Sequence, residues 1–409
     1  MKGCEFDKTL QLTKDMVSFP SVSDVSNEAV SQFVADRLAA LQFEVEWHSY
    51  VDIKSNYKVS LVAKRGSGVG GIAYLAHTDV VPAEDWSVDF CGPFEPRERD
   101  DRLYGRGTCD MKGSLACALT AASSIEPSSQ TKPIYFVVTS DEEIGMMGAQ
   151  MVNARSKYFQ EMVDGDTVGI VGEPTKLGVF HSHKGGQRMA IRARGRSAHT
   201  STNDGLNANY QLIPALPELL AIREESEKNP NYRNGNFDPP TLSWNMTITN
   251  EPEAVNVTTS LAQVNIFLRT MPNVDHSPLL TAIKSLCEKH QLELDINEAV
   301  EPWQVPSDAL WVQEMLALVG STESRSVCFA TDAGILQRLK RMLICGPGDI
   351  QQAHRSDEWI GFDQLKRGVE VFRRAFQHWA CDSTRYSPGR DEGPSDKVPV
   401  GTMDPSRWC

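Results

Sequence analysis

Short apolar segments that end in a histidine or an acid are the feature that most constrains the fold of this chain. His77, the acidic cluster 141–143 and Glu173 each follow such a segment, and a run of small residues over 113–122 indicates a helix between the first two. Apolar strands that alternate with helices are typical of an α/β fold with a largely parallel sheet. Because ligands bind beyond the carboxyl ends of parallel strands, the sequence predicts a polar site at one edge of this sheet.

The pattern changes near residue 187 and changes back after about residue 300. Met189, Ile191 and Ala193 alternate with arginines, which indicates a sheet with one solvated face. The elements that follow give the order β-α-β-β-α-β, that of a split βαβ or ferredoxin-like sandwich, with its first helix expected over 206–220. We therefore predict three parts, which are a discontinuous main domain of residues 1–184 and 300–381, an inserted domain of residues 185–299, and an irregular tail of residues 382–409.

The composition argues against several classes of function. No run of about 18 apolar residues occurs, so a membrane span is not expected. The polar N-terminus has no apolar core of a secretory signal, and we expect a cytoplasmic protein. The net charge of −13 argues against nucleic acid or an anionic membrane as the main partner, since both favour a basic surface. The nine cysteines form no C-x-x-C pair, which argues against a disulfide framework and a zinc ribbon.

The polar residues at the strand ends have two interpretations, a metal site or ordinary loops and caps. His77 and Asp79 lie two apart on a strand and project to the same side, so the carboxylate can orient a metal-binding imidazole. Asp110 precedes a helix and could instead cap it. The adjacent acids at 141–143 repel each other unless a cation compensates, although a solvated loop would also accommodate them.

The number of candidate ligands favours a metal site. Two histidines and at least three carboxylates at one sheet edge suit two divalent ions, with one carboxylate bridging and a position left for water. Of two adjacent glutamates, one can bind metal while the other takes a proton from the water. His354, taken alone, would be an ordinary surface histidine.

The order of these motifs resembles that of the di-zinc amidohydrolase and peptidase family that includes acetylornithine deacetylase, succinyl-diaminopimelate desuccinylase, carboxypeptidase G and aminoacylase. The resemblance covers about residues 7–380, and its motifs are His77-Thr78-Asp79, Gly107-Thr108-Cys109-Asp110-Met111-Lys112-Gly113, Asp141-Glu142-Glu143, Gly172-Glu173-Pro174 and His354. It implies a zinc-exopeptidase-like catalytic domain, with the inserted domain as its lid or dimerisation domain. It also implies a homodimer and two zinc ions, for which cobalt or manganese could substitute.

Carried over residue by residue, the resemblance assigns roles to the site. The ligands it implies are His77 and Glu173 for one zinc, Glu143 and His354 for the other, and Asp110 as the bridge between them. Glu142 would be the general base, and Asp79 would orient His77.

The resemblance extends to the lid. There His199 would stabilise the oxyanion, often in the site of the other subunit. Asn256 and Arg269 would hold the substrate carboxylate, and Lys184 matches a substrate-side segment. For His199 the alternative is a plain loop histidine.

Within this family the motifs look closest to acetylornithine deacetylase. We therefore predict hydrolysis of the amide bond of an N-acyl amino acid, a small substrate that bears a carboxylate. A zinc-bound water would attack the carbonyl, with Glu142 as the base. The alternatives are a dipeptidase or carboxypeptidase, an aromatic amine or amide hydrolase of the same family, and a non-catalytic relative that binds amino-acid-like ligands.

Overall fold

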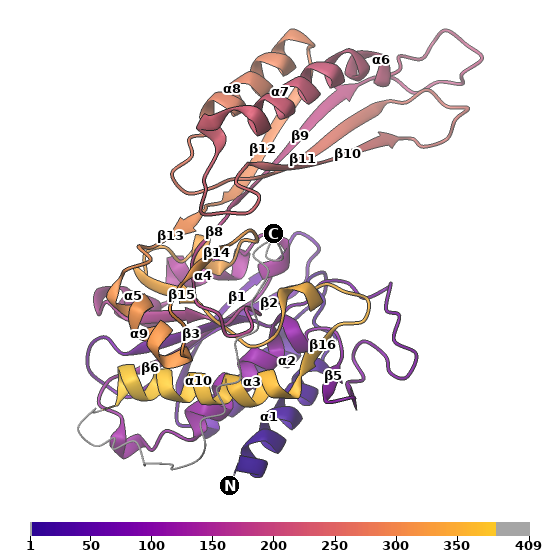
Figure 1. The fold of residues 1–409 in the computed structure, drawn as a ribbon. Coiled ribbons are helices and arrows are strands. Elements are labelled where there is room, and N and C mark those ends of the chain that lie inside the picture. Colours follow the sequence, from indigo (N-terminus) through magenta and orange to yellow (C-terminus); the bar gives the residue numbers. More distant parts are fainter. Residues whose placement is uncertain (1, 382–409) are drawn as a thin grey trace.

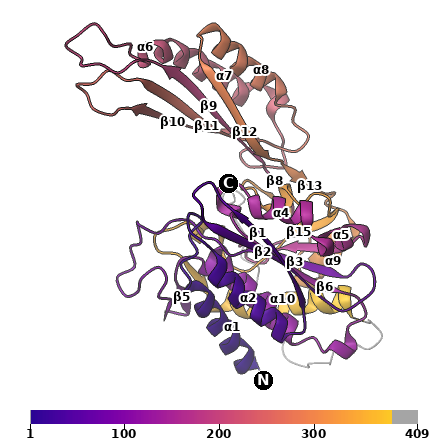
Figure 2. The same ribbon diagram turned by 180° about the vertical axis from the view of Figure 1, so that it is seen from behind.

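The computed structural model describes residues 2–381, which form a larger and a smaller body (Figure 1). The chain passes from the larger body to the smaller one between strands β8 (Phe180–His183) and β9 (Gly186–Arg194). It returns between β12 (Glu293–Val300) and β13 (Trp303–Gln304). The view from behind in Figure 2 shows the same junction, with β8 and β13 at the edge of the larger body and β9 and β12 continuing into the smaller one. The predicted irregular tail, residues 382–409, lies outside the described residues.

The larger body is built on a nine-stranded sheet whose centre is parallel and whose edges are antiparallel. Its strands, in spatial order, are β1 (Glu44–Val51), β2 (Tyr57–Arg65), β6 (Ile134–Thr139), β3 (Ile72–His77), β7 (Val168–Val171), β15 (Arg341–Ile344), β8 and β13, and β14 (Arg325–Val327) pairs with β8. Every residue of β3, β6 and β7 is buried, as their continuous apolar sequences predict. The predicted α/β class with a largely parallel sheet is confirmed.

Helices cover both sides of this sheet (Figure 1). The helices of the larger body are α1 (Lys2–Val17), α2 (Glu28–Ala40), α3 (Gly113–Ser123), α4 (Met147–Arg155), α5 (Lys157–Asp164), α9 (Leu310–Val319) and α10 (Phe362–Ala380). The small residues of α3 let α10 pack closely against it, and Tyr74 of β3 meets Phe372 of α10 edge to face with ring centroids 5.0 Å apart. This packing fixes the central strands whose ends carry the polar residues.

Strand register brings those ends level with one another. His77, the last residue of β3, is paired with Thr139, the last residue of β6. On the other side of β3, Leu75 is paired with Val171 of β7, so Glu173 follows at the height of His77. The side chains that follow three parallel strands therefore meet at one edge, as expected.

The smaller body is a four-stranded antiparallel sheet with helices on one face (Figures 1 and 2). Its spatial order is β10 (Ser243–Glu251), β11 (Leu261–Arg269), β9 and β12, and its helices are α6 (Asn209–Leu212), α7 (Leu216–Lys228) and α8 (Ser277–Lys289). Alternate residues of β11 are buried beneath the helices, in a core separate from that of the larger body. The predicted β-α-β-β-α-β order is confirmed.

The prediction of a single helix over residues 206–220 is wrong, because the structure divides this segment. The chain forms α6, a 3₁₀ turn over Ile213–Ala215 and then α7. Pro214 lies in that turn and Pro217 in the first turn of α7, and a proline provides no N–H to continue a helix. The apolar residues that suggested one helix face are exposed instead, with Leu206 at 60%, Tyr210 at 77% and Ile213 at 55% of their full accessibility.

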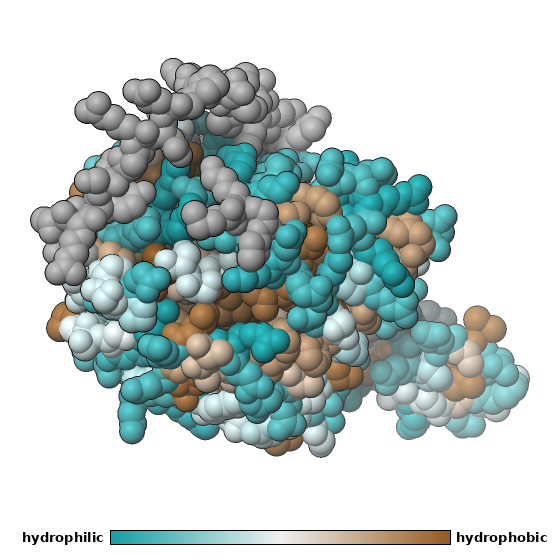
Figure 3. Space-filling view, turned by 90° about the horizontal axis from the view of Figure 1, so that it is seen from below, coloured by the Kyte–Doolittle hydropathy of each residue, from teal (hydrophilic) through white to brown (hydrophobic). Residues whose placement is uncertain are grey.

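A small sheet of β4 (Arg97–Arg99), β5 (Arg102–Tyr104) and β16 (Trp359–Gly361) joins two segments that lie far apart in the sequence. It brings the chain that follows His354 against the chain that precedes Asp110. Neither this sheet nor α1 was expected from the sequence. No helix of the described residues has the length and apolar content needed to cross a bilayer. Seen from below, the larger body is mostly hydrophilic around a smaller hydrophobic area (Figure 3).

Candidate metal centre

Three side chains from separate elements converge beyond the end of β3. His77 ends that strand, Glu173 follows β7, and Asp110 lies in the irregular turn Thr108–Lys112 that precedes α3. One ligand atom from each lies within 4.8 Å of the others, and all three residues are buried. Asp110 does not cap α3, because that helix begins at Gly113 without a side-chain cap. The structure thus favours a ligand over a cap for Asp110.

A second group shares Asp110 and adds Glu143 and His354. His354 Nε2 lies 3.0 Å from Glu143 Oε2 and 3.4 Å from Asp110 Oδ2. The other oxygen of Asp110, Oδ1, lies 3.1 Å from His77 Nε2. Each oxygen of one carboxylate therefore faces a different histidine, which is the arrangement of a bridging carboxylate.

The charges of this cluster shift the pKa values of its members. Burial acts to raise the pKa of Asp110, but hydrogen bonds from His354 and His77 hold it well below its usual range. Burial, and then the charge of Asp110, raise the pKa of Glu173 well above its usual range and also raise the pKa of Glu143. The acids thus carry more negative charge than their surroundings compensate.

The geometry fits a resident metal ion. His77 Nδ1 lies 2.9 Å from the backbone oxygen of Asp79, which can only accept, so Nδ1 donates and Nε2 is the atom presented to the cluster. Within the described part of the chain, no donor forms a hydrogen bond with the buried Glu173 carboxylate. Two histidines and three carboxylates form a donor set that suits borderline divalent ions such as zinc.

The carboxylate of Asp79 contacts more than His77. Its Oδ1 lies 3.6 Å from His77 Nδ1, beyond a hydrogen bond. The same carboxylate accepts the backbone N–H of Glu142 at 3.1 Å and that of Glu143 at 3.2 Å, and the hydroxyl of Ser23 donates to it at 2.8 Å. Asp79 therefore holds His77 through its backbone and the Glu142–Glu143 turn through its side chain.

Asp141, the first acid of the 141–143 cluster, has a structural role that the sequence did not indicate. Asp141 has a left-handed backbone, with φ of 57°, and accepts hydrogen bonds from Lys58 Nζ at 2.7 Å and Tyr50 Oη at 2.5 Å. Lys58 is fully buried, so this ion pair is shielded from water. Asp141 thereby directs Glu142 and Glu143 toward the metal cluster while it stays outside both ligand groups itself.

Glu142 lies beside the cluster without joining either ligand group. Burial raises the pKa of its carboxyl well above the usual range, while the charge of His77 acts in the opposite direction. A second buried acid, Asp332, accepts a hydrogen bond from Thr139 at 2.5 Å through Oδ2, and its Oδ1 has no partner among the described residues. Burial raises the pKa of Asp332 to about 6. The family resemblance also matches the segment Thr331-Asp332-Ala333 to the substrate side, and in the structure the charge of Asp332 acts on both Glu142 and Glu173.

The residues that the sequence predicted to bind substrate or stabilise the oxyanion lie in two separate regions, at the junction of the two bodies and at the far end of the lid sheet. Arg269 ends β11 at the junction of the two bodies, close enough to Glu142 for their charges to interact. Lys184 is buried at the same junction, but its Nζ donates to the backbone oxygens of Pro239 and Thr241, each at 2.9 Å. Two of its three donors therefore hold a lid loop.

His199 and Asn256 lie together at the opposite end of the lid sheet. The N–H of Thr200 donates to Asn256 O at 3.2 Å, and His199 forms a β-bridge with Val257. The nine-residue strand β11 separates this tip from Arg269, a span of about 27 Å. The structure therefore does not bring His199 and Asn256 to the same place as Arg269 within one chain.

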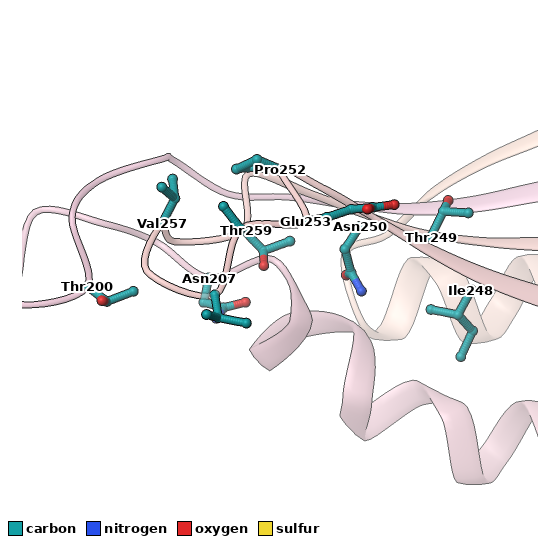
Figure 4. Close-up of a pocket in the computed structure, with 11 residues that line it drawn as sticks. Thr200, Asn207, Ile248, Thr249, Asn250, Pro252, Glu253, Val257 and Thr259 are labelled. Carbon is teal, nitrogen blue, oxygen red and sulfur yellow. The ribbon is translucent and has the colours of Figure 1, made fainter.

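A cavity of about 510 Å³ lies beside this tip. Its lining includes Thr200, Asn207 and Val257 on the loops at the ends of the lid strands and Asn250 near the end of β10 (Figure 4). Of these residues, Thr200 directly follows His199 and Val257 directly follows Asn256 in the sequence. The tip thus presents polar side chains around a recess, far from the metal cluster of the same chain.

Comparisons with known proteins give a consistent result. The model of peptidase family M20/M25/M40 matches residues 73–378. The acetylornithine deacetylase of Pectobacterium carotovorum subsp. carotovorum (strain PC1) is 32% identical over 387 residues, which cover 90% of this chain and 97% of that protein. The acetylornithine deacetylase of Photorhabdus laumondii subsp. laumondii is 30% identical over 390 residues, 91% of this chain and 98% of that protein.

Solved structures share the fold at lower identity. An M20 family metallo-carboxypeptidase from Sulfolobus solfataricus gives a TM-score of 0.71 at 15% identity and covers 91% of this chain and 99% of that one. Human carnosine dipeptidase 1 gives a TM-score of 0.67 at 18% identity, with 92% and 97% covered. The two-body architecture is therefore shared with these structures.

Proposed function

The chain belongs to peptidase family M20/M25/M40, and we propose that it hydrolyses the amide bond of an N-acyl amino acid, as its relatives named acetylornithine deacetylase suggest. The observation that carries this proposal is the placement of Glu142 beside two ligand groups that share Asp110. Such a site supplies a base next to a metal.

We propose two zinc ions as the cofactors, with cobalt or manganese as substitutes. His77, Asp110 and Glu173 would hold one ion, and Asp110, Glu143 and His354 the other. When bound, zinc supplies Lewis-acid polarisation of the substrate carbonyl and of the attacking water.

The chain's own residues then provide the proton transfers. Glu142 takes a proton from the attacking water, because its carboxylate lies beside both ligand groups without belonging to either of them. The same carboxyl delivers the proton to the nitrogen of the leaving amine as the carbon–nitrogen bond breaks. The products are a carboxylate and a free amino acid.

Arg269 is proposed to bind the substrate carboxylate. No carboxylate of the described residues forms an ion pair with its guanidinium, which rests 4.6 Å from the ring centroid of Phe267. A guanidinium can clamp a carboxylate with two parallel hydrogen bonds. Its position at the end of lid strand β11, close to Glu142, would place the amide of an N-acyl amino acid near the base.

We propose that the protein acts as a homodimer in which the lid tip of one subunit completes the site of the other. The separation of His199 and Asn256 from Arg269 supports this, since one chain cannot bring them together without deforming β11. The large apolar side chains of Leu206, Tyr210 and Ile213, each more than half exposed on the lid, also support it, because a partner subunit would cover them.

A substrate panel tests the proposed reaction. The protein is stripped with a chelator, reloaded with zinc or cobalt, and assayed with N-acetylornithine, other N-acyl amino acids, dipeptides and aromatic amides. We expect activity only after reloading and the highest kcat/KM on an N-acyl amino acid. Preference for dipeptides or aromatic amides would replace the proposed substrate class with one of the alternatives.

A further inference from the structure

The turn that carries Asp110 has no regular secondary structure to hold it. Gly107 is left-handed, with φ of 85°, and Asp110 and Met111 depart from helical geometry inside the turn Thr108–Lys112. Helix α3 begins only at Gly113. Something outside the turn must therefore fix the direction of the Asp110 side chain.

The carboxylate of Glu358, which lies far from this turn in the sequence, holds the turn in place. Glu358 accepts the backbone N–H groups of Gly107 at 3.0 Å, Cys109 at 2.9 Å and Asp110 at 3.1 Å. Arg106 Nη1 also donates to it, at 2.9 Å. Glu358 itself is 0% exposed, so these donors replace water completely.

The same residue fixes the segment that carries His354. Glu358 lies four residues after His354 and directly precedes β16, which pairs with β5. Its backbone oxygen accepts the N–H of Gly105 at 3.1 Å. One residue thus ties together the two loops whose side chains face each other across 3.4 Å, Asp110 Oδ2 and His354 Nε2.

Two charges act on Glu358 in opposite directions, because the buried guanidinium of Arg106 stabilises its carboxylate and the nearby carboxylate of Asp110 repels it. Glu358 adds a buried negative charge beside Asp110, in a region already rich in carboxylates. A charged acceptor forms stronger hydrogen bonds to backbone N–H groups than a neutral one, and it fixes their direction. The carboxylate of Glu358 thus holds the turn through three backbone N–H groups, with Arg106 as its counter-charge.

From this geometry we infer that Glu358 is a positioning residue for the metal centre, which acts through the backbone of Asp110 and the His354 loop. The inference rests on the proposed function only in requiring that a divalent metal binds between these ligands. Because Asp110 belongs to both ligand groups, every ion bound there depends on Glu358.

The test is a metal titration of the full chain after chelator treatment. Glu358→Gln keeps the size of the side chain but loses its charge and replaces one acceptor oxygen with a donor. We expect the dissociation constants for Co²⁺ and Zn²⁺ to rise roughly 10–100-fold, as for other residues that orient metal ligands, with the number of ions bound at saturation unchanged. A merely structural defect would lower the competent fraction, and hence the number of ions bound, without changing the affinity of the remainder.

Ser156→Ala is the matched control. Ser156 is buried, caps α5 by accepting the N–H of Phe159 at 3.0 Å, and makes no contact with either ligand group. Its loss should lower the thermal midpoint of the metal-free protein while metal affinity stays as in the unaltered chain. Equal affinities in Glu358→Gln and the unaltered chain would overturn the inference, whereas an unaltered chain that binds no metal would overturn the proposed function itself.

A second variant serves if Glu358→Gln does not fold. Glu358→Asp keeps the charge and shortens the side chain by one methylene, so it cannot reach all of the donors at once. Weaker metal binding at unchanged stoichiometry in this variant supports the positioning role. Affinity equal to that of the unaltered chain contradicts it.

Discussion

In the proposed mechanism, both proton transfers depend on a single carboxylate, that of Glu142. Glu142→Gln removes the basic oxygen but preserves the shape of the side chain, and the residue belongs to neither ligand group. We expect kcat to fall by about 10²–10⁴-fold, the usual contribution of a general base, with metal content and KM little changed. Steady-state kinetics together with metal analysis would check this, and a variant that retains its kcat would remove Glu142 from the mechanism.

A substitution of Asp79 can separate two roles of its side chain, which are to orient His77 and to hold the turn that carries Glu142 and Glu143. Its carboxylate accepts the N–H groups of Glu142 and Glu143, whereas His77 is held by the backbone oxygen. Asp79→Ala should therefore weaken metal binding to the group that contains Glu143 at least as much as to the group that contains His77. The expected loss is about 10–100-fold in affinity.

Two backgrounds make this prediction measurable. His77→Ala leaves only the Asp110, Glu143 and His354 group complete, and His354→Ala leaves only the Asp110, His77 and Glu173 group. Metal titration of Asp79→Ala in each background shows which group depends on the carboxylate. If only the His354→Ala background responds, Asp79 acts through His77 alone.

At the scale of elements, the sequence could indicate strand ends but not the contacts that support them. The apolar runs of β3, β6 and β7 are local patterns, and the residues that follow them are polar in the sequence itself. The Lys58–Asp141 ion pair joins residues 83 apart, and it follows from the pairing of β2 with β6, which no local pattern reveals. The contact of Glu358 with Asp110 spans 248 residues for the same reason.

The apolar spacing over residues 206–220 gave a wrong prediction, because which side of a helix is buried depends on the elements that pack against it. The spacing of Leu206, Tyr210 and Ile213 suggested a core-facing helix, yet these residues are exposed and Leu212, Ala215 and Leu219 are buried instead. Periodicity shows that one face is apolar, but it cannot show whether the lid core or a second molecule covers that face.

Strand β8 contributes a pH-dependent term to stability through His183. This residue is fully buried, its Nδ1 donates to Lys184 O at 2.8 Å, and its Nε2 has no partner among the described residues. Burial lowers its pKa to about 4, and nearby Arg269 acts in the same direction. The unfolded chain therefore binds more protons than the folded one between pH 6.5 and pH 4, and stability falls as the pH falls through this range.

His183→Gln removes this titration while it keeps a side-chain donor for Lys184 O. Between pH 7 and pH 5 the variant should lose roughly 2 kcal/mol less unfolding free energy than the unaltered chain. Urea unfolding of both metal-free proteins at the two pH values measures the difference, in which the metal ligands common to both cancel. Identical losses would show that His183 does not titrate as its burial requires.

At the scale of the whole molecule, the length of the lid sheet determines what one chain can do. Arg269 lies at the junction near Glu142, while His199 and Asn256 lie about 27 Å away at the far end of β11. If His199 stabilises the oxyanion, it must do so in another subunit. A dimer with twofold symmetry would place each lid tip over the partner's metal centre in the same way.

Mixing two inactive variants tests this arrangement directly. Glu142→Gln lacks the base but keeps His199, and His199→Ala lacks the lid histidine but keeps Glu142. In a mixed dimer, one site combines an intact Glu142 with an intact His199 from the partner, and the other site lacks both. After equal amounts exchange subunits, half of the dimers are mixed and half of their sites are complete, so activity should recover to about one quarter of the unaltered level. If His199 served its own chain, every site would lack one of the two groups and mixing would restore nothing.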